Sequence, residues 1–128
     1  MASDLPLSGM HVLVVEDEYF IASALVRDLK KAGAVTIGPS PTVSGALKLI
    51  PETTQIDVAL LNFKLRDGTA LPLTEELRRR GIPFIFITGN DEAVRALFPD
   101  ALVHLKPANM PKLVLTLAAM IGERGSSE

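Results

Sequence analysis

The sequence predicts an α/β protein with a doubly wound, five-stranded parallel sheet between two layers of helices. Short apolar runs alternate along the chain with segments of helical periodicity. The apolar runs are nearly continuous, which is typical of strands buried on both faces of a parallel sheet. Strict alternation of strand and helix implies right-handed crossovers, and therefore a three-layer sandwich.

Each predicted strand is an apolar run bounded by polar or turn-forming residues. The predicted strands cover residues 11–15, 34–37, 56–61, 83–87 and 101–105. We expect residues 38–41 to form a loop, because glycine and proline alternate with small residues there.

Each predicted helix follows a strand and repeats apolar residues at spacings of three and four. The predicted helices cover residues 19–32, 43–50, 70–80, 91–98 and 111–121. Gly33 and Gly81 are expected to end the first and third helices, and Pro51 the second. Pro72 falls in a first helical turn, where proline is tolerated.

The 128 residues are enough for one domain with a single buried core. We expect this domain to cover residues 10–122, between tails at 1–9 and 123–128. A hydrophobic content of 48% with 22% charged residues favours a globular domain over a disordered chain. The net charge of −2 gives no broad basic surface, so no nucleic-acid partner is expected.

Compartment and membrane association follow from composition and hydropathy. The absence of cysteine excludes disulfides and thiolate metal sites and is consistent with a reducing compartment. The first nine residues lack the pattern of a signal peptide, and the longest apolar runs are too short to span a bilayer. We therefore expect a cytoplasmic protein without a membrane partner.

Polar residues follow four of the predicted strands: Glu16 and Asp17, Asn62, Thr88 and Lys106. Ligands of an open parallel sheet bind outside the carboxyl ends of its strands. Each residue alone has an ordinary explanation, such as a helix N-terminal charge or a turn residue. Their combination at successive strand ends predicts a binding site.

Four motifs carry a family resemblance: VVEDE at 14–18, DVALLN at 57–62 with Asp67-Gly68 after it, FITG at 86–89, and LKP at 105–107. With them the chain resembles a response-regulator receiver domain of two-component signalling, from about residue 11 to residue 121. Residues 83–89 are also similar to the Pro-Phe-x-Phe-Ala-Thr-Gly signature of a subclass of single-domain receivers, with Ile87 at the alanine position. The resemblance implies a flavodoxin-like sheet with the strand order 2-1-3-4-5.

The resemblance also implies roles for the polar residues. Mg²⁺ would be bound directly by Asp17, through water by Glu16, and by position 62 and the backbone carbonyl of Lys64. The resemblance further implies that Thr88 donates a hydrogen bond to a phosphoryl group and that Lys106 pairs with it. Oxygen ligands suit this hard cation, and phosphoryl transfer needs positioning and charge neutralisation. The Lys106–Pro107 peptide bond is expected to be cis.

Three positions depart from the family pattern. Asn62 stands where the family has its phosphate-accepting aspartate, and a carboxamide is a poor nucleophile. Its carbonyl oxygen can still bind a metal, but the site loses one negative charge, so we expect weaker Mg²⁺ binding. Val103 replaces the Tyr or Phe that moves inward on activation in the family, and Ala108 replaces a frequent phenylalanine.

We therefore expect a stand-alone receiver that is not an enzyme and docks a histidine kinase or phosphotransferase and an output protein. Asn62 would prevent its phosphorylation, either as the natural residue of a pseudo-receiver or as an engineered substitution. The alternative is a Mg²⁺-dependent phosphohydrolase-like enzyme with Asp17 as nucleophile. That enzyme would need a second carboxylate two residues further on, and Glu18 is not at that spacing.

Several other residues have ordinary structural interpretations. We expect His11 to lie at the opposite edge of the sheet, His104 to be a core or interface histidine, and residues 78–80 to form a solvated helix end. Leu115, Ala119 and Met120 are predicted to lie on the back of the last helix. We interpret them as a surface for a partner or for a homodimer.

Overall fold

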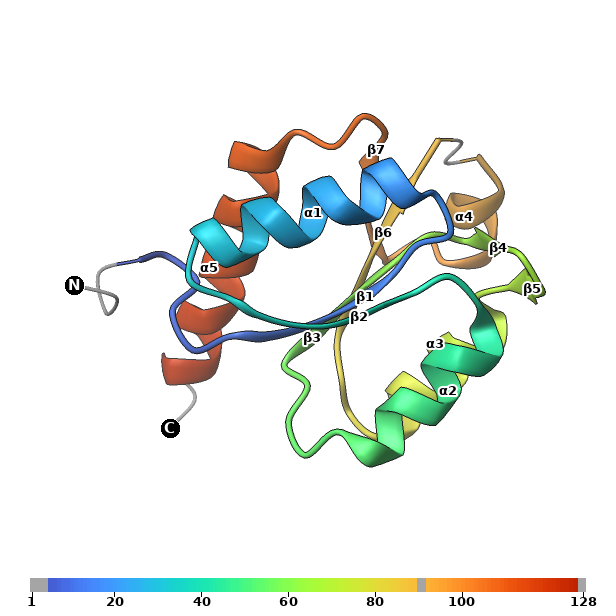
Figure 1. Cartoon of the computed structure of the whole chain (residues 1–128), viewed down its shortest axis with the longest axis horizontal. Coiled ribbons are helices and arrows are strands. Elements are labelled where there is room, and N and C mark those ends of the chain that lie inside the picture. Colours follow the sequence, from blue (N-terminus) through green and yellow to red (C-terminus); the bar gives the residue numbers. More distant parts are fainter. Residues whose placement is uncertain (1–4, 90–91, 127–128) are drawn as a thin grey trace.

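A computed structural model describes residues 5–89 and 92–126 and has at its centre a parallel sheet (Figure 1). This sheet has five strands in the order β2-β1-β3-β6-β7. The strands are β1 (His11–Val15), β2 (Val35–Ser40), β3 (Val58–Leu61), β6 (Phe84–Thr88) and β7 (Leu102–Leu105). The predicted fold class and strand order are thereby confirmed.

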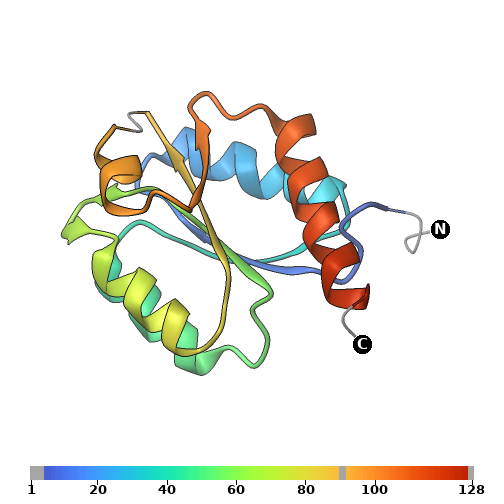
Figure 2. The same cartoon turned by 180° about the vertical axis from the view of Figure 1, so that it is seen from behind.

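Helices cover both faces of the sheet, as Figures 1 and 2 show from opposite sides. Helices α1 (Tyr19–Lys31) and α5 (Met110–Ser126) pack on one face. Helices α2 (Val43–Glu52), α3 (Leu71–Arg79) and α4 (Glu92–Leu97) pack on the other. Within the described residues, no helix is both long enough and apolar enough to cross a bilayer.

Each central strand contributes to two hydrophobic cores, because successive side chains of a strand point to opposite faces. In β1, Val12 and Val14 pack in the core beneath α1 and α5. Leu13 and Val15 pack in the core beneath α2 and α3. This double burial explains why the strands are apolar at every position.

Two predicted boundaries were wrong at proline residues. Strand β2 does not stop at residue 37 but continues through a cis Gly38–Pro39 bond to Ser40. It lies at the edge of the sheet, where a residue without an N–H group is tolerated. Helix α2 includes Pro51 and ends one residue later, where the N–H of Thr53 donates to the carbonyl of Ile50.

Other segments add structure that the sequence did not predict. A small hairpin of β4 (Lys64–Leu65) and β5 (Gly68–Thr69) follows β3, and α5 extends beyond residue 121. Leu7 is fully buried, and its N–H donates to the carbonyl of Ala32 at 2.8 Å. The domain boundary at residue 10 stays a prediction. The cis Lys106–Pro107 bond is as expected.

Candidate functional site

The sheet itself fixes the predicted site residues along its carboxyl edge. The N–H of Asn62 donates to the carbonyl of Val15 at 2.9 Å, which continues the pairing of β3 with β1. The N–H of Lys106 donates to the carbonyl of Thr88 at 2.9 Å, which does the same for β7 and β6. Backbone pairing therefore brings residues distant in sequence to one edge.

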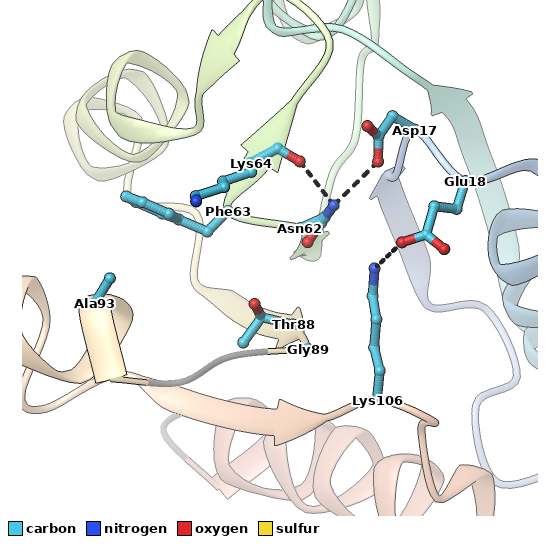
Figure 3. A pocket seen from close by; sticks show the side chains of 9 residues that line it. All are labelled: Asp17, Glu18, Asn62, Phe63, Lys64, Thr88, Gly89, Ala93 and Lys106. Carbon is cyan, nitrogen blue, oxygen red and sulfur yellow. Dashed lines mark hydrogen bonds and ion pairs between the residues drawn. The ribbon is translucent and has the colours of Figure 1, made fainter.

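These residues meet around a pocket of about 380 Å³ (Figure 3). Its lining includes four of the predicted site residues and the residue whose carbonyl was expected to bind metal. The lining residues are Asp17, Glu18, Asn62, Phe63, Lys64, Thr88, Gly89, Ala93 and Lys106. Glu16 does not line the pocket, because its side chain is buried beneath the rim and only 2% exposed.

The Asn62 carboxamide points its nitrogen at the acidic residues. Its Nδ2 atom donates to the carbonyl oxygen of Lys64 at 2.8 Å and to Oδ1 of Asp17 at 3.1 Å. A longer contact of 3.3 Å reaches Oε2 of Glu16. The amide thus joins the three groups that were expected to surround a metal ion.

Glu16 is a carboxylate buried beside a lysine. Its Oε1 atom lies 2.8 Å from Nζ of Lys106, and its Oε2 atom accepts the N–H of Glu18 at 3.0 Å. Burial raises the pKa of Glu16, and the contacts with Lys106 and the Glu18 N–H oppose that rise. The lysine therefore provides the countercharge for this carboxylate.

Lys106 is shared between two carboxylates. Its Nζ atom also lies 3.1 Å from Oε1 of Glu18, as the dashed line in Figure 3 shows. Burial would lower the pKa of Lys106, but the contacts with Glu16 and Glu18 outweigh it and raise that pKa. The ammonium group is thus charged and directed into the pocket.

Sequence reasoning missed the contact of Glu18 with Lys106. It also missed Arg66, whose guanidinium group donates to the backbone carbonyl of Asp17 at 3.3 Å. No spacing in the sequence indicates either contact, because each joins two segments that are distant in the sequence and become neighbours only in the folded chain. The acidic run at 16–18 was the only available hint. One carboxylate oxygen from each of its three residues lies within 4.8 Å of the other two.

Thr88 is buried at the end of β6, beside the strand that carries Lys106. Figure 3 shows its side chain at the pocket, near Asn62 and Lys106. A hydroxyl group and an ammonium group on neighbouring strand ends can together donate to the oxygens of one anion. This side of the pocket is chemically suited to a phosphoryl group.

The acidic side of the pocket fits a divalent cation only in part. Carboxylate oxygens of Glu16 and Asp17 and the Lys64 carbonyl are ligands that Mg²⁺ prefers. Asn62, however, presents N–H groups to these oxygens, and a donor cannot bind a cation. With the Asn62 amide in this orientation, the complete set of residues does not fit Mg²⁺.

The two histidines lie outside the pocket. Nδ1 of His11 lies 3.0 Å from the carbonyl of Gly9 and 3.6 Å from Oδ2 of Asp57, at the start of β1. His104 is half-buried in β7, and burial together with the charge of Lys112 lowers its pKa. Both placements agree with the structural interpretations given above.

The last helix exposes only two of the three residues that were predicted to form a surface. Leu115 and Ala119 are exposed, as expected. Met120 is partly buried and packs against the core, so its assignment to the outer face was wrong. The apolar surface of α5 is therefore narrower than the sequence suggested.

Comparisons with known proteins agree with this architecture. Residues 12–118 match the response regulator receiver domain family, and the chain belongs to that family. Its site is accordingly that of a signalling module in two-component systems, a class that is generally not enzymatic. Members of this class typically bind Mg²⁺ through acidic residues such as those at 16–18.

Solved structures of other receiver domains are similar to this chain. SdrG from Sphingomonas melonis Fr1 is 38% identical, with a TM-score of 0.76 over 88% of this chain and 96% of SdrG. The BeF3-activated conformation of SdrG from Pseudomonas melonis Fr1 is 37% identical, with a TM-score of 0.74 over 88% and 97% of the two chains. A receiver protein from Sinorhizobium medicae WSM419, 18% identical with a TM-score of 0.80 over 92% and 98%, shares the fold. A search of curated protein sequences gave no match.

Proposed function

We propose that this receiver signals by docking its partners and is not phosphorylated at position 62. The observation that carries the proposal is the place of Asn62, at the end of β3 between the acidic residues and Lys106. A carboxylate there could attack phosphorus to form an acyl phosphate, whereas a carboxamide has no useful nucleophile and no analogous product. The proposal holds whether Asn62 is natural or engineered.

In this proposal, the other residues of the phosphoryl site keep their ability to bind an anion. Thr88 and Lys106 are the groups that would bind a phosphoryl group or a similar anion. The relative SdrG supports this assignment, because it has a BeF3-activated conformation. In our chain such an anion would compete with Glu16 and Glu18 for Lys106.

We also propose that this site binds Mg²⁺ weakly. Glu16, Asp17 and the Lys64 carbonyl would supply oxygen atoms, and Asn62 could add its Oδ1 atom only after its amide turned around. Because a carboxamide brings no charge, the affinity would be lower than with aspartate at position 62.

The partners follow from the family. We propose a histidine kinase or phosphotransferase as one partner and an output protein as the other, in the cytoplasm, where kinases obtain ATP. A second copy of the chain would dock on the exposed part of α5 around Leu115 and Ala119. No role as a phosphohydrolase is proposed, since the family is one of signalling modules.

Restoring the nucleophile tests the proposal. The variant Asn62→Asp, incubated with acetyl phosphate and MgCl₂, should gain about 80 Da, the mass of one phosphoryl group, by intact mass spectrometry. Asn62→Ala, treated identically, is the matched control and should gain nothing. A folded Asn62→Asp variant without an adduct would contradict the proposed phosphoryl site, and a stable acyl phosphate on the unaltered protein would contradict the role proposed for Asn62.

A further inference from the structure

We infer that the Asn62 carboxamide takes the place of a divalent cation and keeps the acidic site closed without metal. This inference rests on the proposed function, because it concerns how the same site is held. It adds that the site has a resting state that forms without Mg²⁺.

The geometry centres on one nitrogen atom. Nδ2 of Asn62 contacts the Lys64 carbonyl at 2.8 Å, Asp17 Oδ1 at 3.1 Å and Glu16 Oε2 at 3.3 Å. These acceptors come from the segments after β1 and β3, and they converge on one point, as ligands converge on a metal. An amide nitrogen carries two protons, so the three acceptors share them.

The surrounding acceptors determine which way the amide faces. If the amide turned by 180°, Oδ1 would face two carboxylates and a carbonyl with no proton between them, which is unfavourable in a partly buried site. A cation requires that opposite orientation, since only Oδ1 can bind it. Metal binding must therefore break the present amide contacts first.

Cationic side chains supply the positive charge that a metal ion would otherwise bring to the site. Lys106 lies 2.8 Å from Glu16 and 3.1 Å from Glu18, and Arg66 donates to the carbonyl of Asp17. The acidic run thus has countercharges without a metal ion. An aspartate at position 62 would instead add a third carboxylate against Glu16 and Asp17, and the site would then need a cation.

Metal binding and thermal unfolding test the inference on three proteins: the unaltered chain, Asn62→Asp and Asn62→Ala. By calorimetry the unaltered chain should bind Mg²⁺ at least tenfold more weakly than Asn62→Asp. MgCl₂ in place of EDTA, at a concentration that just saturates Asn62→Asp, should raise the melting temperature of Asn62→Asp and leave that of the unaltered chain unchanged. Affinities within tenfold of each other, or equal shifts in melting temperature, would overturn the inference.

Asn62→Ala removes the donor while leaving the acceptors in place. In EDTA it should melt at a lower temperature than the unaltered chain, because the acceptors around Nδ2 lose their shared partner. An alanine variant that melts at the same or a higher temperature counts against the role of the amide.

NMR of the unaltered chain provides a measurement that needs no variant. The side-chain NH₂ protons of Asn62 should exchange with solvent more slowly than those of the unfolded chain. MgCl₂ at a concentration that just saturates Asn62→Asp should leave their shifts unmoved. Fast exchange, or displacement by MgCl₂, would overturn the inference. The phosphorylation test is separate. If Asn62→Asp takes up no phosphoryl group but MgCl₂ leaves the melting temperature and NMR shifts of the unaltered chain unchanged, only the proposed function fails.

Discussion

The carboxylate of Asp67 accepts a hydrogen bond of 2.7 Å from the backbone N–H of Val43, the first residue of α2. Its second oxygen accepts the N–H of Ser44 at 3.1 Å. Thr42 caps the same helix with its own side chain, so α2 has both a local cap and a distant one. Asp67 thereby ties the hairpin beside the site to α2.

Replacing Asp67 should therefore destabilise α2. In Asp67→Asn the side chain loses its charge and one of its two acceptor oxygens. In the unaltered chain both oxygens accept backbone N–H groups at the positive end of the helix. We expect the melting temperature to fall by a few degrees, measured by circular dichroism at neutral pH. The exposed Asp100→Asn is the control, and an equal fall in both variants would contradict the capping role.

The same contact predicts a pH dependence. Hydrogen bonds from Val43 and Ser44 lower the pKa of Asp67 below its ordinary value of 3.8. A carboxyl group with a depressed pKa in the folded state stabilises the protein above its unfolded pKa. The gap in melting temperature between the unaltered chain and Asp67→Asn should therefore be constant near neutral pH and shrink as the pH falls below 3.8. A gap that persists at lower pH would argue against this mechanism.

The ion pair between Glu16 and Lys106 allows a third prediction. Lys106→Met should leave Glu16 buried without its countercharge and lower the free energy of unfolding by about 2–4 kcal/mol in urea titrations. Glu16→Gln combined with Lys106→Met should be milder than the sum of the single variants, with a coupling of at least about 1 kcal/mol. Additive single effects would show that the pair does not stabilise the fold.

Much of the fold could be predicted because burial on both faces leaves a clear signal. All four residues of β3 are buried, and they read as an unbroken apolar run. The end of β2 gave no such signal, because only one of the six residues of this edge strand is buried and the strand contains Pro39. Whether proline fits in a strand depends on whether that strand lies at an edge, which only the assembled sheet determines.

The site residues could be placed at strand ends for the same reason, since each follows an apolar run. The orientation of the Asn62 amide could not be predicted, because it depends on three acceptors that converge only in the fold. The sharing of Lys106 with Glu18 is of the same kind, because the two residues are 88 positions apart. Sequence patterns thus locate these groups at an edge but do not give their pairing.

The exposed part of α5 gives a fourth prediction, about self-association. Leu115 is 71% exposed and borders an apolar groove with Ala32 and Met110. If a second copy docks there, Leu115→Glu should abolish a concentration-dependent dimer in sedimentation velocity experiments, because it places a charge in the apolar contact. Leu97→Glu, at an exposed leucine of α4, should leave the dimer intact. A chain that is monomeric at every concentration would refute the proposed dimer.

The arginine run at the end of α3 is a solvated helix end, as expected, because Arg78, Arg79 and Arg80 are all exposed, but Arg78 also contacts aromatic rings. Its guanidinium carbon lies 5.6 Å from the ring centre of Phe84 and 5.3 Å from that of Phe98, whereas Arg79 pairs with Glu76 on the surface. A guanidinium over an aromatic ring contributes about 0.5–1 kcal/mol at an exposed site, while an exposed ion pair often contributes nothing measurable. We expect Arg78→Ala to lower the free energy of unfolding by about that amount, and by more than Arg79→Ala, in matched urea titrations. Arg78→Leu, which keeps apolar contact but removes the charge, separates the two contributions. If Arg78→Leu is as stable as the unaltered chain, the contact with the rings is one of packing alone.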